Sequence, residues 1–139
     1  MQQNLTVRSS NVARVLLDGN EVGLLQNVRP SDDYAPEPAS GIGNIHVQEW
    51  VPTQARHTIS VGFLALRKTS LYKMGIIPEN GDAALQGLVF DFEVFDKVDN
   101  TIIRKYLGCS YASGDIEISK HAIIASNCQF NALDVAGTL

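Results

Sequence analysis

Hydrophobic and polar residues alternate with a period of two along most of the chain, which is typical of β-strands that bury one face. His57–Leu66 carries apolar side chains at every second position from Ile59, with Thr, Ser and Gly between them. Ala122–Leu133 alternates in the same way, and its second face is polar but uncharged. The predicted strands are Asn11–Leu17, Val22–Val28, Ile45–Val51, His57–Leu66, Gly87–Phe95, Thr101–Leu107, Ile116–Ser119 and Ala122–Leu133. We therefore expect a mainly β protein, an antiparallel sandwich or barrel.

Turn residues separate these strands and leave room for one helix. Asp18-Gly19 is a typical hairpin turn, and Pro78–Asp82 consists of turn residues. Thr69–Gly75 begins with capping hydroxyls and ends with glycine, so it predicts a short helix. Arg29–Asn44 is rich in Pro, Gly, Ser and Asp and predicts a long extended loop or an irregular hairpin. Loops of this length in compact domains usually have a function.

Length and composition indicate one globular domain. The chain has 139 residues, of which 45% are hydrophobic and 19% charged. We expect a single β domain over residues 1–139, with residues 1–10 as an N-terminal arm. No apolar run approaches the ~20 residues that span a bilayer, and Met1–Ser10 lacks the apolar centre of a signal peptide. These features predict a soluble product of the cytoplasm without a membrane partner.

The charge distribution argues against tight binding of nucleic acid. Eleven Lys and Arg residues face 15 Asp and Glu residues, a net charge of −4. The basic residues are scattered, whereas affinity for phosphates requires a concentrated basic face. Loose proximity to DNA is compatible with this composition.

The ionisable side chains form no recognisable catalytic motif. His46, His57 and His121 are isolated in strand-like segments and are expected at the surface or at caps. Asp91 and Glu93 lie two apart in a predicted strand, so they point the same way. They fit three interpretations: an acid and base pair, a solvated strand face, or a negative potential facing a channel.

Neither cysteine nor glycine spacing indicates a cofactor. Cys109 and Cys128 form no CxxC pair and have no histidine at metal-ligand spacing, so we expect buried, reduced thiols. Gly41-Ile42-Gly43 lacks the lysine and helix of a phosphate-binding loop and is interpreted as turn backbone. The sequence therefore predicts no catalytic residue, metal or cofactor.

The order of the segments resembles that of a known family. The segments that carry the resemblance are Glu21–Gly23, Leu25–Val28, Gly41–Ile45, Gln48–Pro52, Ile59–Val61, Gly108–Ser110 and Ser126–Ala132. Together they resemble the tail tube proteins of tailed bacteriophages, which are similar in fold to the type VI secretion tube protein. The resemblance extends from about Asn11 to Val135.

The resemblance implies a structural virion protein, made in the host cytoplasm, whose six copies form a ring with a shared inner β-barrel. Stacked rings would form a tube for genome ejection, with tail sheath, baseplate and tape-measure proteins as partners and viral DNA passing without specific binding. Candidate lumen-lining residues are Asp91, Glu93, Asn127, Gln129 and Asn131. Candidate ring-stacking residues in the long loop are Asp32, Asp33, Tyr34 and Glu37.

Two alternatives stay open from the sequence. A baseplate or tail-terminator ring protein would have a related fold and differ only in its partners. A small-ligand-binding β-barrel would instead line its cavity with aromatic side chains, whose other interpretation is core packing. The candidates for that cavity are Trp50, Phe63, Phe90, Phe92 and Tyr106.

Overall fold

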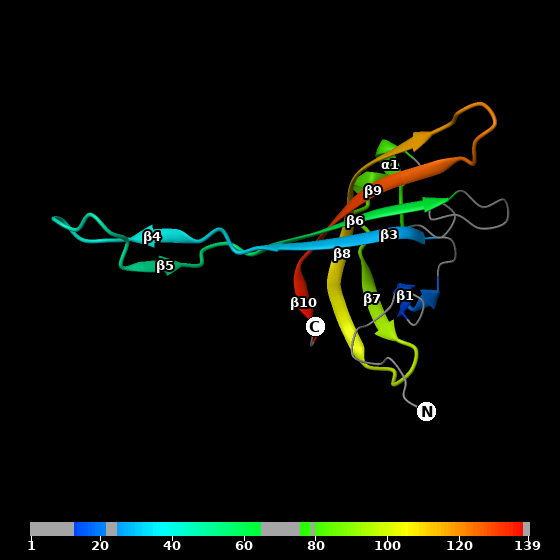
Figure 1. The fold of residues 1–139 in the computed structure, drawn as a ribbon. Coiled ribbons are helices and arrows are strands. Elements are labelled where there is room, and N and C mark those ends of the chain that lie inside the picture. Colours follow the sequence, from blue (N-terminus) through cyan, green and yellow to red (C-terminus); the bar gives the residue numbers. More distant parts are fainter. Residues whose placement is uncertain (1–12, 22–24, 65–75, 79, 138–139) are drawn as a thin grey trace.

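The computed structural model describes residues 13–21, 25–64, 76–78 and 80–137 and shows a mainly antiparallel β protein (Figure 1). The predicted helix Thr69–Gly75 and the N-terminal arm lie outside these residues. The strands are β1 (Ala13–Leu17), β2 (Asn20–Glu21), β3 (Leu25–Asp33), β4 (Glu37–Ala39), β5 (Glu49–Val51), β6 (Arg56–Leu64), β7 (Phe90–Asp96), β8 (Ile102–Glu117), β9 (Ala125–Ala132) and β10 (Asp134–Ala136). One helix, α1 (Gly81–Leu85), precedes β7. Within the described residues, no helix is long and apolar enough to cross a membrane.

One curled sheet of eight strands forms the body of the subunit. Its order is β2-β1-β7-β8-β9-β6-β3, and β10 also pairs with β8. The 16-residue strand β8 joins the two halves, because its first part pairs with β7 and its second part, Ser110–Glu117, pairs with β9. The sheet curls into a half-barrel around this long strand (Figure 1).

Gly108 marks the place where β8 passes from one half to the other. Its φ of 64° is unfavourable for other residues, and an added Cβ would lie 2.8 Å from the side chain of Leu133. Leu133 separates β9 from β10 and donates its N–H to the carbonyl of Leu107 at 2.9 Å. Glycine at this position lets β8 keep both partners.

The core lies on the inner side of the curl, where the two halves face each other. The rings of Phe90 in β7 and Phe130 in β9 meet edge to face, with 4.9 Å between their centroids. Tyr111 from β8 packs against the other side of the same cluster. The buried apolar residues are Leu17, Ile59, Val61, Phe63, Ile76, Ile77, Phe90, Phe92, Tyr106, Cys109, Cys128 and Phe130. The predicted alternation in β6 and β9 is confirmed by this set.

A long hairpin, residues 34–55, projects from the body between β3 and β6 (Figure 1); we call it the arm. Strands β4 and β5 pair within it, and residues 40–48 form its tip. At its root, Thr53 donates its N–H to the carbonyl of Tyr34 and its hydroxyl to that of Ala35. The arm is thus a paired ribbon rather than an irregular loop.

The prediction of a loop over Arg29–Asn44 is therefore wrong in part. Arg29–Asp33 belongs to β3, where each residue pairs with β6 across the sheet. Only strand pairing in three dimensions shows this, because Pro30, Ser31 and the two aspartates are poor strand formers by themselves. The predicted strand Ile45–Val51 shortens to β5, and its first residues form the tip.

Several predicted boundaries differ from the observed ones. Most of Thr101–Leu107 and the start of Ile116–Ser119 belong to one strand, β8, which runs through Gly114. A Cβ at position 114 would collide with the Tyr111 hydroxyl, so glycine fits there within the strand. The strand that pairs with β1 after the turn is β2, Asn20–Glu21, and residues 22–24 of the predicted return strand Val22–Val28 lie outside the described residues. Leu25–Val28 lies in β3 and pairs with β6, although the Asp18-Gly19 turn is confirmed by positive φ at both residues. The predicted turn, Pro78–Asp82, contains the start of α1. The strands predicted from Gly87 and Ala122 begin at Phe90 and Ala125.

Replacing Phe130 by alanine tests this core. Because Phe130 is fully buried, Phe130→Ala is expected to lower the free energy of unfolding by about 3–5 kcal/mol. The matched control Ile123→Ala removes an exposed side chain and should change it by less than about 0.5 kcal/mol. Denaturant unfolding of the dilute subunit measures both, and equal losses would contradict the core assignment.

Candidate functional site

Four strands of one half of the sheet present a continuous polar face. These strands are β3, β6, β9 and the second part of β8, and their other face packs on the core. The register aligns polar residues in rows across them, because directly paired residues of antiparallel strands share a face. The three rows are Asn27–Gly62–Asn127–Asp115, Arg29–Ser60–Gln129–Ser113 and Ser31–Thr58–Asn131–Ser110.

The three central rows of this polar face contain little charge, and the flanking rows add Asp33, Arg56 and Glu117. Arg29 and Asp115 are the only charged members of the three rows, and they stand at opposite edges. The face is hollowed into a depression of about 340 Å³, whose polar lining is Asn27, Ser60, Ser113, Asp115, Asn127 and Gln129. Small hydroxyl and amide side chains offer hydrogen bonds to water without attracting phosphate groups strongly.

Gly62 allows two amide side chains to lie across the centre of this face. An added Cβ at Gly62 would stand 2.9 Å from the Asn27 amide oxygen and 3.0 Å from that of Asn127. The amides therefore occupy the space above the glycine, and any side chain there would displace them. Asp115 accepts the backbone N–H of Asn127 at 3.3 Å, which ties β8 to the same row.

The two groups of predicted lumen residues are separate in the structure. Asn127, Gln129 and Asn131 lie together on the polar face, whereas Asp91 and Glu93 lie on β7 in the other half of the sheet. Glu93 forms an ion pair with Lys105 at 3.6 Å, and Asp91 accepts the N–H of Gly108 at 3.3 Å. The two carboxylates thus have separate partners.

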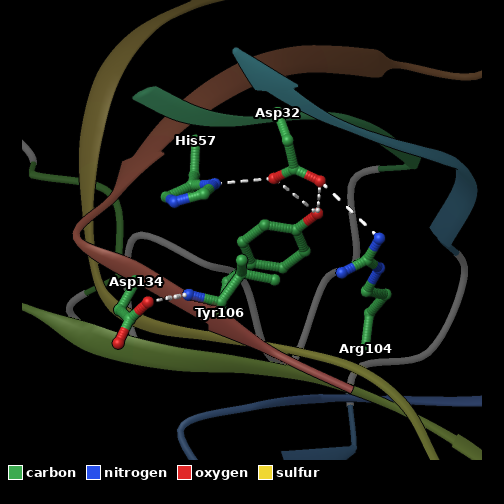
Figure 2. A network of polar contacts seen from close by, with 6 residues as sticks. Asp32, His57, Arg104, Tyr106 and Asp134 are labelled. Atoms are coloured by element: carbon green, nitrogen blue, oxygen red, sulfur yellow. Dashed lines mark hydrogen bonds and ion pairs between the residues drawn. The ribbon is translucent and has the colours of Figure 1, made fainter. Parts of the chain in front are cut away.

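A polar cluster lies at the root of the arm (Figure 2). The Asp32 carboxylate, from β3, is 2.6 Å from Nδ1 of His57, its paired residue on β6. It also accepts the Tyr106 hydroxyl at 3.3 Å, and its second oxygen is 3.7 Å from the Arg104 guanidinium. The Tyr34 ring meets the His57 ring edge to face at 5.8 Å.

Burial gives this cluster its electrostatic character. His57 and Tyr106 are almost fully buried, whereas Asp32 and Arg104 retain partial exposure. Burial, and next the charge of Asp32, raise the pKa of Tyr106 to about 12, so its phenol stays protonated and donates to the carboxylate. The prediction of a surface or capping role is therefore wrong for His57. The sequence gives no adjacent acid, and Asp32 reaches it only through strand pairing.

The arm exposes an unusual number of apolar side chains. Ile42 and Ile45 at the tip are fully exposed, and Trp50 on β5 is 61% exposed. Tyr34, Val47 and Val51 are exposed on the same ribbon. The arm contains no Lys or Arg, and its acidic residues are Glu37 and Glu49. Clustered apolar exposure of this kind marks a surface that contacts another molecule.

The aromatic residues considered for a ligand cavity have other positions. Phe63, Phe90, Phe92 and Tyr106 are buried in the core, and Trp50 is exposed on the arm. None of them lines the polar depression. In the described part of the chain, no group of three or more His, Cys, Asp or Glu side chains is arranged to hold a metal ion.

Comparison with known proteins identifies this architecture. The fold of this chain is similar to that of solved proteins from tail tubes and from a contractile injection system. The tail of an empty gene transfer agent particle, refined with C6 symmetry, gives a TM-score of 0.69 at 12% identity, over 96% of this chain and 100% of that one. The SPP1 tail tube protein gives a TM-score of 0.68 at 11% sequence identity, over 91% of this chain and 76% of that one. A chain of the sheath-tube complex of an extracellular contractile injection system, PVC, gives a TM-score of 0.67 at 12% sequence identity, over 95% of this chain and 91% of that one.

The family assignment follows from the sequence itself. The model of the Phi812 tail tube protein family matches residues 2–136, and the chain belongs to that family. It is therefore a structural protein of a tail tube, located in the tail of a virion. No curated protein matches the chain significantly.

The two cysteines give a test of the buried side of the site. Burial raises the pKa of both Cys109 and Cys128 to about 12, so both thiols are protonated at neutral pH. We expect no alkylation of the native subunit by iodoacetamide at pH 8 and complete alkylation in guanidinium chloride, measured by mass spectrometry. The control Ser40→Cys, exposed on the arm, should react in the native state at once. Rapid native alkylation of the wild-type chain would contradict the burial.

Proposed function

We propose that six copies of this chain form a ring and that the rings stack into a hollow tube for genome ejection into the host. The observation that carries this proposal is the four-stranded polar face, which, among the described strands, has an unpaired edge on each side. Negative-stain electron microscopy of the purified protein tests it. Rings or tubes are expected, and a subunit that stays monomeric at high concentration would contradict it.

Edge pairing supplies the physical reason for a ring. In the described part of the chain, β3 pairs only with β6, and no strand pairs with the outer edge of β8 over Ser113–Glu117. Exposed edges favour pairing with another chain. If β3 of one copy pairs with Ser113–Glu117 of the next, the contact is head to tail, and a suitable rotation closes it into a ring. The sheets then join into one barrel.

In such a barrel the polar face would line the lumen. Its other face is already buried against the core, so the face with Asn127, Gln129 and Asn131 is the one left to point inward. A wall with few cations favours sliding of DNA, since each phosphate contact with Lys or Arg slows it. The support for Asp91 and Glu93 as lining residues is weaker than for the three polar residues of β9, because both carboxylates already have partners on β8.

The arm is proposed to join one ring to the next. The arm leaves the sheet at the Arg56 end of β6. The other end of β6 is Leu64, which pairs with Ala125, the first residue after the β8–β9 connection. That connection also exposes apolar side chains, among them Ile118 and Ile123. A copy stacked along the strand direction would bring the arm toward this second apolar region. We extend the stacking role to Asp32, Asp33, Tyr34 and Glu37 at the base of the arm.

The remaining roles follow from a tail tube assignment. The chain would be made in the host cytoplasm, act without catalysis or cofactor, and meet sheath, baseplate and tape-measure proteins in the assembled tail. A ring at the baseplate or at the tube terminus is the second candidate. The PVC sheath/tube terminator supports it, because its fold is equally similar, with a TM-score of 0.67 over 94% of this chain.

Removing the arm should block stacking and leave the subunit folded. Asp33 and Arg56 are paired, so residues 34–55 can be replaced by Asn-Gly, which closes a two-residue hairpin. We expect native circular dichroism but no tubes longer than single rings in electron micrographs. The point variant Ile45→Glu should also shorten tubes, whereas the control Val98→Glu, exposed on the β7–β8 turn, should not. Full-length tubes from the arm deletion would refute the stacking role.

Cysteine accessibility in assembled tubes tests the lumen. Gln129→Cys should react in the free subunit with both a small maleimide and a bulky polyethylene glycol maleimide, because the residue then lies on an open face. In capped or long tubes, only the small reagent should react. Lys97→Cys, on the exposed turn after β7, is the control. Equal reaction of Gln129→Cys with both reagents in tubes would remove this residue from the lumen.

Genome delivery gives a second readout of the same wall. Gln129→Lys adds a phosphate contact to the face, and Asp91→Lys does so on β7. Virions with Gln129→Lys tubes of normal length should eject DNA more slowly, and the effect should weaken at high salt. Unchanged ejection kinetics for a variant would exclude its position from the path of the DNA.

A further inference from the structure

The Asp32 cluster lies where the arm meets the body. Asp32 pairs with His57 in the register, and Asp33 with Arg56 closes the β3–β6 ladder one position further on. Beyond that pair the chain leaves the sheet. Any displacement of Asp32 therefore moves the first residues of the arm.

Asp32, on β3, holds groups from two other strands. His57 belongs to β6, and Tyr106 and Arg104 belong to the first part of β8, far along the sheet from β3. Figure 2 shows the carboxylate between the His57 ring and the Arg104 guanidinium, with the Tyr106 hydroxyl below it. The cluster thus connects the strand that carries the arm to the opposite half of the curled sheet.

Contacts continue from the cluster into the arm. The Tyr34 ring lies edge-on against His57, and the Tyr34 carbonyl accepts the N–H of Thr53 from the returning strand. Asp33 accepts the N–H of Ala35, which has a φ of 44° and turns the chain away from the sheet. Both strands of the arm are therefore fixed at their root through residues that touch the cluster or follow it directly.

We propose that Asp32 is a positioning residue that fixes the direction in which the arm leaves the body, and that it acts in ring stacking only through the arm. This role in stacking rests on the proposed function, in which the arm joins one ring to the next. A preoriented arm avoids the ordering cost that a free hairpin would meet on contact with the next ring. Asp32 is hydrogen-bonded to His57 and Tyr106 inside the subunit, so, unlike Asp33, Tyr34 and Glu37, it would serve stacking through the arm and not by direct contact.

Distance measurement between spin labels on the free subunit tests this directly. Labels at Ser40→Cys in the arm and Lys97→Cys on the body report the arm direction, and the buried native thiols stay unlabelled. The wild-type background should give a narrow distance distribution by pulsed electron resonance. Asp32→Asn should broaden it, and Tyr106→Phe, which removes only a hydroxyl, should broaden it less. The control Asp82→Asn, on α1, should leave it unchanged.

Assembly of the unlabelled variants is the second readout. Asp32→Asn should raise the concentration needed for tube formation by about tenfold, as expected when a hydrogen bond to a charged group no longer holds the arm. Thermal unfolding shows whether each variant is folded, and Tyr106→Phe carries the test if Asp32→Asn is not. A broad wild-type distribution, or a narrow one for folded Asp32→Asn, overturns the positioning role. Absence of wild-type tubes would instead contradict the proposed function, while the distance data still decide on Asp32.

Discussion

The pairing of β8 with strands on both halves of the sheet is the constraint on which the rest of the subunit depends. Its first part is hydrogen-bonded to β7 and β10, and its second part to β9. One continuous strand therefore belongs to both halves of the curled sheet. The halves cannot separate without loss of the hydrogen bonds that β8 makes to β7 or to β9, and this keeps the core between them enclosed. The polar face and the arm cluster both include residues of this strand, so their geometry depends on the same curl.

The division of faces then explains how one small domain serves assembly. The inner face of β6 and β9 supplies the core, and the outer face supplies uncharged polar rows. A sheet with one buried and one solvated face is ordinary for antiparallel strands. The three central rows of that solvated side contain only Arg29 and Asp115 as charged residues, although surface strands commonly carry Lys and Glu. Low charge in these rows agrees with the proposed lumen, along which DNA would slide.

The sequence predicts those strands of the fold in which hydrophobic and polar residues alternate regularly. The strict alternation around Ile59 and Cys128 identifies β6 and β9 and assigns their faces correctly. It does not identify the end of β3 as a strand, because Pro30-Ser31-Asp32 has low strand propensity and is held in the sheet by pairing with β6. The Asp32 cluster lies beyond sequence reasoning for a related reason. Its members are 25 and 74 residues apart from Asp32 along the chain, and only the curl brings them together.

Pro30 has a consequence for the encounter of free subunits. It lies in β3 opposite Ile59, in a strand that has one neighbour in the described structure. Proline is accepted in edge strands where its missing donor faces outward. A strand that pairs with this edge then lacks one backbone hydrogen bond in the middle of the ladder, so backbone pairing alone binds it weakly. Nonspecific edge-to-edge aggregation is disfavoured, and stable pairing requires a neighbour whose side chains are also complementary.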